Sequence, residues 1–87
     1  MLNENEQKVL DAVVEAIKYC TGNEFGYSED VKKFTDLPII TLSGYMSQLV
    51  QKGYVTVHED YGQIELLRKA AEAATDDNVR TCWNFAD

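Results

Sequence analysis

The sequence has few of the residues from which metal sites and disulfide frameworks are built. It contains two cysteines, Cys20 and Cys82, and one histidine, His58, in 87 residues. A structural zinc site takes four ligands at short paired spacings, and a disulfide framework takes more cysteines than are present. We therefore expect no metal, no cofactor and two reduced, mostly buried thiols.

The usual combinations of catalytic groups are also missing. A nucleophilic serine requires a base, and no histidine falls at a position from which it would share a site with one of the serines. The adjacent acids Glu29–Asp30 and Asp76–Asp77 are typical of helix ends and turns rather than of an acid–base pair. We expect that the chain is not an enzyme and assign no catalytic residue.

No segment approaches the 18 or so uninterrupted apolar residues of a membrane helix. The N-terminus is acidic and lacks the basic region and apolar run of a secretion signal. A chain of this size forms one domain and buries only roughly 60 to 65% of its unfolded surface. These features predict a soluble, cytoplasmic single domain over residues 1–87, without a membrane partner.

The first half of the chain is predicted to be mainly helical. Asn3 and Glu6 have the spacing of a capping box, and Gly22 marks a stop, so the first helix should cover about residues 4–20. Its apolar stripe has helical spacing and consists of Val9, Leu10, Val13, Val14, Ile17 and Cys20.

A short second helix is expected after a loop. Residues 21–27 are loop-like, with a short strand at 25–27, and Ser28 is placed to cap a helix over about 29–34. Val31 and Phe34 would be its core contacts. Residues 35–38 form the turn, because Pro38 disfavours helical geometry in the residue before it.

The most informative segment is 41–58, where a helical pattern stops at a glycine and continues as a strand. A third helix should begin between Pro38 and Thr41 and end at Lys52, and Gly53 supplies the left-handed stop. Strands are predicted at 54–58 and 63–66 around a turn at 59–62, followed by a helix at 67–75 and an extended segment at 79–85. The inward residues of the third helix would be Leu42, Met46, Leu49 and Val50.

This order of elements over residues 4–66 resembles the winged helix-turn-helix domains, and within them the MarR-like regulators. The resemblance implies an α+β fold with a three-helix core, a short β-hairpin wing and a C-terminal helix or tail. It also implies a DNA-binding transcription regulator whose third helix enters the major groove of double-stranded DNA. One short helix with few cations binds weakly, so a homodimer is expected as well.

The resemblance also assigns roles by position. The wing would be formed by residues 58–61, and the backbone contacts would be lysines 32, 33 and 52. The set that would contact DNA is Thr41, Ser43, Gly44, Ser47, Gln48, Gln51, Lys52, Lys32 and Lys33.

Charge supports a second hypothesis. The chain has a net charge of −7, and affinity for DNA depends on cations that neutralise phosphates. Residues 28–54 hold three acids and three bases and are neutral, whereas the wing turn carries Glu59 and Asp60. The alternative is an acidic interaction module or inhibitor that binds a basic, nucleic-acid-binding protein. Its contact residues would be Glu59, Asp60, Trp83 and Phe85.

Two residues of the third helix have alternative interpretations. Gly44 costs about 1 kcal/mol relative to alanine inside a helix, which indicates the close approach of another helix or of a DNA backbone. We favour packing against another helix. The ring of Tyr45 could contact DNA or fill the interface between the first and third helices.

Overall fold

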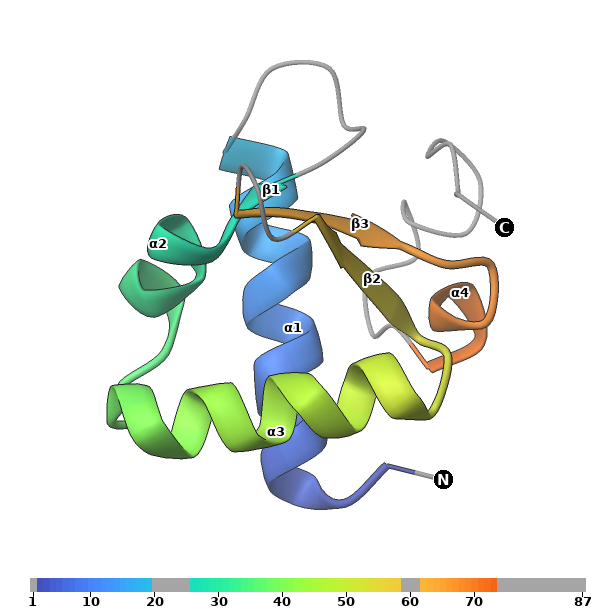
Figure 1. Ribbon diagram of the computed structural model, residues 1–87, viewed down its shortest axis with the longest axis horizontal. Coiled ribbons are helices and arrows are strands. Elements are labelled where there is room, and N and C mark those ends of the chain that lie inside the picture. The colour runs from blue at the N-terminus through green and yellow to red at the C-terminus, as the bar shows by residue number, and fades with distance from the viewer. Residues whose placement is uncertain (1, 20–25, 59–61, 74–87) are drawn as a thin grey trace.

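The computed structural model describes residues 2–19, 26–58 and 62–73. These residues form a small α+β domain with four α-helices and a three-stranded antiparallel sheet (Figure 1). The elements are, in chain order, α1 (Glu4–Tyr19), β1 (Gly26–Tyr27), α2 (Ser28–Val31), the 3-10 helix η1 (Lys32–Phe34), α3 (Ile39–Gln51), β2 (Val55–His58), β3 (Gln63–Leu66) and α4 (Ala70–Ala73).

Helix α1 is the centre of the fold, and α3 crosses it (Figure 1). The predicted capping box is confirmed. The backbone N–H of Asn3 donates to Glu6 Oε1 at 3.0 Å, and the backbone N–H of Glu6 donates to Asn3 Oδ1 at 2.8 Å. The apolar face of α1 is buried, and its large buried members are Val9, Leu10, Val13, Val14 and Ile17.

The sheet joins the predicted hairpin to a strand from the first half of the chain. The strand order is β1-β3-β2, with Gly26 and Val57 paired to Ile64 from opposite sides. A Cβ added to Gly26 would lie 3.1 Å from Ile17 Cγ1, which is closer than ordinary van der Waals contact. Glycine at this position therefore allows β1 to run directly against α1.

The junction between α3 and β2 has the predicted left-handed glycine. Gly53 has φ +84°, its N–H donates to the Val50 carbonyl at 3.1 Å, and the N–H of Tyr54 donates to the Leu49 carbonyl at 3.0 Å. This pair of bonds is a Schellman motif, which satisfies carbonyls that the end of a helix leaves unpaired. The chain then turns directly into the strand, and Tyr54 is buried.

Several local predictions were wrong. Ser28 is the first residue of α2 rather than its cap, because the N-cap is Tyr27 and makes no side-chain cap bond. Phe34 is 39% exposed, since it ends η1 beyond the core and meets the ring of Tyr19 edge-on at 6.1 Å. Val50 is 41% exposed, because Leu42 and Leu49 already occupy the inward side of α3.

The helix predicted at 67–75 begins later than expected, and its predicted last two residues lie outside the described part of the chain. The N–H of Leu67 donates to the Tyr54 carbonyl at 2.9 Å, so this residue still belongs to the sheet edge, and α4 begins at Ala70. Gln7 of α1 holds α4 in place by donating to the Ala73 carbonyl at 2.9 Å. The expected extended segment at 79–85 and Cys82 lie outside the described residues.

Candidate interaction surface on helix α3

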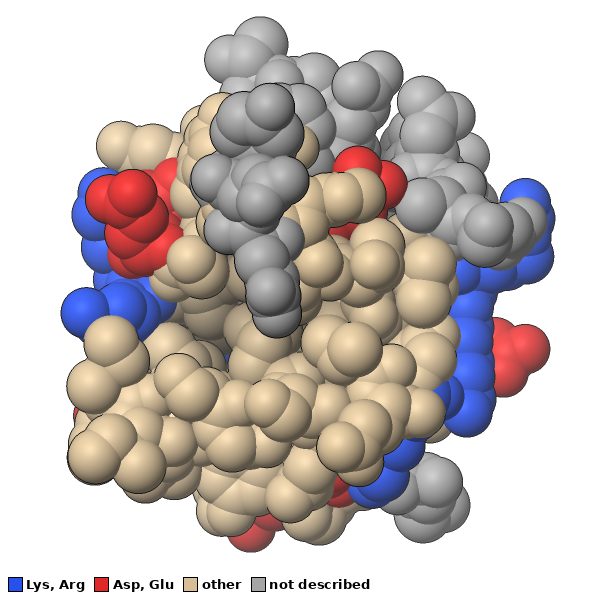
Figure 2. Space-filling view, in the orientation of Figure 1, with Lys and Arg blue, Asp and Glu red and all other residues tan. Residues whose placement is uncertain are grey.

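The exposed side of α3 carries no charged side chain. None of its 13 residues is acidic or basic, although 26% of the whole chain is charged. Figure 2, in the orientation of Figure 1, shows an uncharged surface over this helix with charged residues at its edges. We call this surface the α3 outer face, and it consists of Ile40, Ser43, Gly44, Ser47, Gln48 and Gln51, all of which are exposed.

Five of the six α3 residues that the resemblance assigned to DNA therefore share one exposed face. The sixth, Thr41, is partly buried at the side of the helix. Two apolar residues at the start of α3 were not predicted to be exposed: Ile40, on the α3 outer face, is 84% exposed, and its neighbour Ile39 is 55% exposed. The sequence could have indicated this uncharged surface, because residues 37–51 contain no charged residue.

A groove runs along one side of the α3 outer face, between α3 and β2. Its volume is about 440 Å³, and Val57 forms its wall on the β2 side. The remaining lining comes from α3 and is also uncharged, namely Ser43, Met46, Ser47, Val50 and Gln51. The groove extends the uncharged surface from the helix onto the first strand of the hairpin.

Gly44 lies on this face with open space around it, as far as residues 2–19, 26–58 and 62–73 are concerned. A Cβ added there would meet no atom within 4 Å other than the backbone of α3 itself. No other described helix packs closely against Gly44, so the favoured interpretation of packing against another helix is wrong for α1, α2 and α4.

Tyr45 is directed the other way, into the interface between α1 and α3. Its hydroxyl oxygen accepts a hydrogen bond from Asn5 Nδ2 at 2.9 Å, and the ring packs against the core. Of the two interpretations, the structure supports the one that places Tyr45 between the helices. The side chain is engaged within the domain rather than presented on the α3 outer face.

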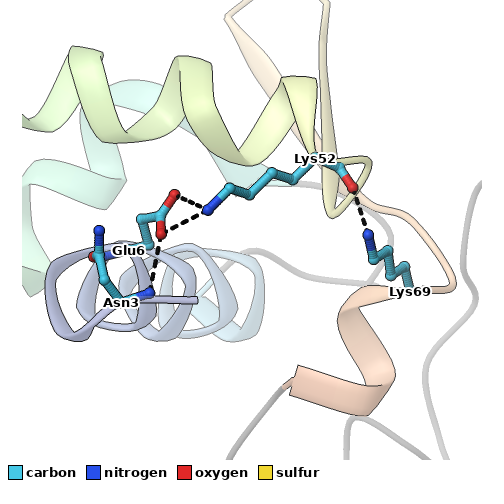
Figure 3. A network of polar contacts seen from close by, with 4 residues as sticks. All are labelled: Asn3, Glu6, Lys52 and Lys69. Atoms are coloured by element: carbon cyan, nitrogen blue, oxygen red, sulfur yellow. Dashed lines mark hydrogen bonds and ion pairs between the residues drawn. The ribbon is translucent and has the colours of Figure 1, made fainter. Parts of the chain in front are cut away.

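Lys52, at the end of α3, binds a carboxylate of α1. Its Nζ lies 2.8 Å and 2.7 Å from the two carboxylate oxygens of Glu6, whose side chain is 1% exposed (Figure 3). The backbone hydrogen bond from Asn3 and then the bond from Lys52 lower the pKa of Glu6 below its ordinary value. Lys69 Nζ donates to the Lys52 carbonyl at 2.9 Å, which extends the network to the segment before α4.

The other two lysines assigned to DNA are the first two residues of η1, and acidic residues of α2 lie beside them. Lys33 Nζ lies 3.1 Å from Asp30 Oδ1, and this hydrogen bond with its opposite charge raises the pKa of Lys33. Lys32 lines a hollow at the start of α3 together with Glu29. The three lysines therefore do not form a continuous positive band along α3.

The hairpin residues are described only in part. His58 is exposed at the end of β2, and its Nε2 lies 2.9 Å from Glu65 Oε1 on β3. The proposed contacts Glu59, Asp60, Trp83 and Phe85 lie outside the described residues, as does Tyr61 of the wing.

Comparisons of the chain with protein-family models, with curated proteins and with solved structures gave no match. Among residues 2–19, 26–58 and 62–73, no group of three or more His, Cys, Asp and Glu side chains is placed to hold a metal ion. No helix in the described part of the chain is both long and apolar enough to cross a membrane.

Proposed function

We propose that the chain is a winged-helix domain that acts as a protein-interaction module and binds its partner through the α3 outer face. The observation that carries this proposal is the uncharged character of α3 on a chain of net charge −7, with Ile40 84% exposed. Protein contacts are depleted of charge at their core, and an uncharged, partly apolar face fits that composition. The partner surface is expected to be uncharged where it meets α3.

The order of elements supports the winged-helix part of the proposal. Three helices precede a β-hairpin, and the short strand β1 joins the hairpin at β3. In a domain of this type α3 holds the position of the recognition helix and the β2–β3 hairpin that of the wing. The α3 outer face would then be the surface that such domains present to a ligand.

The distribution of cations favours protein over DNA as that ligand. Phosphate contacts by lysine and arginine dominate affinity for DNA. Here Lys52 is held by Glu6, Lys33 is held by Asp30, and the face between them has no cation. Gln48 and Gln51 could contact adenine, but glutamines alone supply none of the phosphate neutralisation that brings a helix to the duplex.

A DNA-binding assay tests the inference that the α3 outer face does not bind DNA. A labelled random duplex of about 20 base pairs should show no change in fluorescence anisotropy with up to about 10 µM protein at about 50 mM salt, where electrostatic binding is strongest. Binding under these conditions, if weakened by Gln48→Ala, would overturn the proposal in favour of the DNA-binding regulator.

Site-specific photocrosslinking tests the protein-binding surface. A photoreactive amino acid is placed at Ser47, on the α3 outer face, or at Glu15, an exposed residue of α1, in cells that express the chain. Protein adducts that form from position 47 and not from position 15 support the proposal. Equal adducts from both positions, or nuclease-sensitive adducts from position 47, would contradict it.

A further inference from the structure

We propose that the partner of the α3 outer face is a second copy of this chain, bound across a two-fold axis that passes between Gly44 and Ser47. The inference rests on the proposed protein-binding function and names the partner for the same surface. Two observations carry it, the location of charge on the chain and the order of side-chain sizes along α3.

Charge restricts how two copies can meet. Each copy carries a net charge of −7, so copies repel each other at long range, and like charges placed opposite each other in a contact cost several kcal/mol. The α3 outer face and the wall of its groove contain no charged residue. Two copies that meet through this surface place no acid against an acid at the contact, and Ile40 leaves water.

The side chains at the middle of the outer face have a symmetric order of sizes. Ile40, Gly44, Ser47 and Gln51 fall within about 60° of helix rotation, because successive residues are about 100° apart. Their order is large, small, small, large, and it is the same in both directions along the helix. A two-fold contact requires such a self-complementary surface, since each residue meets its counterpart from the other copy.

In an antiparallel pair of α3 helices about this axis, each large side chain faces a large side chain of the second copy, and each small residue faces a small one. Gly44 of one copy faces Ser47 of the second copy, so the helix axes can approach to about 8 Å, the short end of the usual range. Ile40 faces Gln51 of the second copy and packs on its methylene groups, while the amide stays in water at the rim. Ser43 similarly faces Gln48 of the second copy.

This arrangement explains why a glycine is present on an exposed helix face. A Cβ at position 44 would meet no atom within 4 Å from the part of the chain that the structure describes, apart from the backbone of α3, so glycine brings that part of the fold no packing advantage. In the pair, the absence of that Cβ is what allows the two helices to approach closely. The same contact covers Gln48 and Gln51, so a dimer of this kind could not present α3 to a DNA groove.

Sedimentation velocity on the full chain tests the proposal. Over about 1 to 100 µM protein, the mass should rise from 9.9 kDa toward twice that value. Gly44→Arg and Ser47→Arg should each raise the dissociation constant at least about tenfold, whereas the control Glu15→Arg on α1 should leave dimerisation intact or strengthen it. Thermal unfolding of dilute Gly44→Arg checks that the fold survives, as the open space at position 44 predicts.

The salt dependence of binding provides a second readout, because salt should affect a dimer of two acidic copies and a complex with a basic protein in opposite directions. Raising the salt from about 50 to about 500 mM screens the repulsion between two acidic copies and should tighten the dimer, whereas it weakens the binding of an acidic chain to a basic protein. A monomer at about 100 µM at both salt concentrations, or a Gly44→Arg variant that dimerises as well as Glu15→Arg, would overturn the proposal. If the chain is monomeric but the adducts formed from position 47 contain a different protein, the proposal that the partner is a second copy is wrong, and the proposed protein-binding function stands.

Discussion

The Nζ atom of Lys52 bridges both carboxylate oxygens of Glu6, at 2.7 and 2.8 Å, and thereby ties the end of α3 to the start of α1. Glu6 is also the capping residue that receives the backbone N–H of Asn3. One buried carboxylate therefore stabilises the first turn of α1 and binds Lys52, the residue that caps the C-terminal end of α3. The same contact draws the charge of Lys52 away from the α3 outer face.

The stability of the domain should fall in acid because of Glu6. Its pKa is lowered in the folded state, so its contribution is fully present above the unfolded value of about 4.3 and is lost as the pH falls through the lower folded value. We expect the free energy of unfolding, measured with urea, to decrease as the pH is taken from about 6 to below 4. Glu6→Gln should be less stable at pH 6 and should lose less on acidification.

The loss of stability in acid should be intermediate for Lys52→Ala, between the losses of the wild type and of Glu6→Gln. The variant removes the second cause of the lowered pKa but keeps the first, the hydrogen bond from the backbone of Asn3. The steepness of the acid-induced loss should therefore rank as wild type, then Lys52→Ala, then Glu6→Gln. An unchanged pH profile in Glu6→Gln would show that other carboxylates control acid unfolding.

Neighbouring residues on α3 should respond differently to truncation. Leu49 is fully buried, so Leu49→Ala should lower the free energy of unfolding by roughly 2 to 5 kcal/mol through the cavity that it leaves. Val50 is 41% exposed, and Val50→Ala should cost less than about 1 kcal/mol. Chemical denaturation of both variants measures the difference, and similar losses would mean that the register of α3 differs from the one described.

Substitution by alanine should change the free energy of unfolding in opposite directions at two glycines. Gly44→Ala should stabilise the monomer by about 0.5 to 1 kcal/mol, because alanine favours a helix and the Cβ enters open space. Gly53→Ala should destabilise it by about 1 to 2 kcal/mol, because φ +84° is costly for a residue with a Cβ. Denaturation at low protein concentration, where any dimer has dissociated, gives both values. A destabilising Gly44→Ala would contradict the open surroundings of this residue.

Tyr45→Phe should cost about 0.5 to 1.5 kcal/mol of stability, since it removes the acceptor of the hydrogen bond from Asn5 Nδ2 and keeps the packed ring. The phenylalanine variant is the sharp test, because larger changes would also disturb the contact between α1 and α3. Asn5→Ala in the same background should then have little additional effect, as expected when two residues share one bond. Fully additive losses would mean that the bond is not made in solution.

Much of the local structure could be predicted from short stretches of sequence. The capping box at Asn3 and Glu6, the stop at Gly53 and the strand at 63–66 depend on backbone preferences and on the spacing of apolar residues over a few positions. The end of α2 and η1 was less predictable. Val31 and Phe34 have similar local patterns, but only Val31 reaches the core.

The surface of α3 shows what local patterns leave undecided. The sequence of residues 39–51 already shows that this helix has no charged residue. The structure shows in addition which of its side chains are buried and which are exposed. Val50 satisfies the inward pattern as well as Leu42 does, yet the space beneath the helix accommodates Leu42 and Leu49 and leaves Val50 at the groove. Packing against α1 decides between such alternatives, because it depends on where the two helices cross.

The sequence by itself determined the helix periods, the glycine stop, the hairpin and the neutral charge of residues 28–54, since each follows from neighbouring residues alone. Only the tertiary structure decided that β1 joins β3, that Gly44 meets open space, and that Lys52 binds a carboxylate 46 residues away. The physical reason is that an ion pair or a strand pair across the fold depends on the relative positions of whole elements. These positions are set by burial of the shared core, which no single segment specifies.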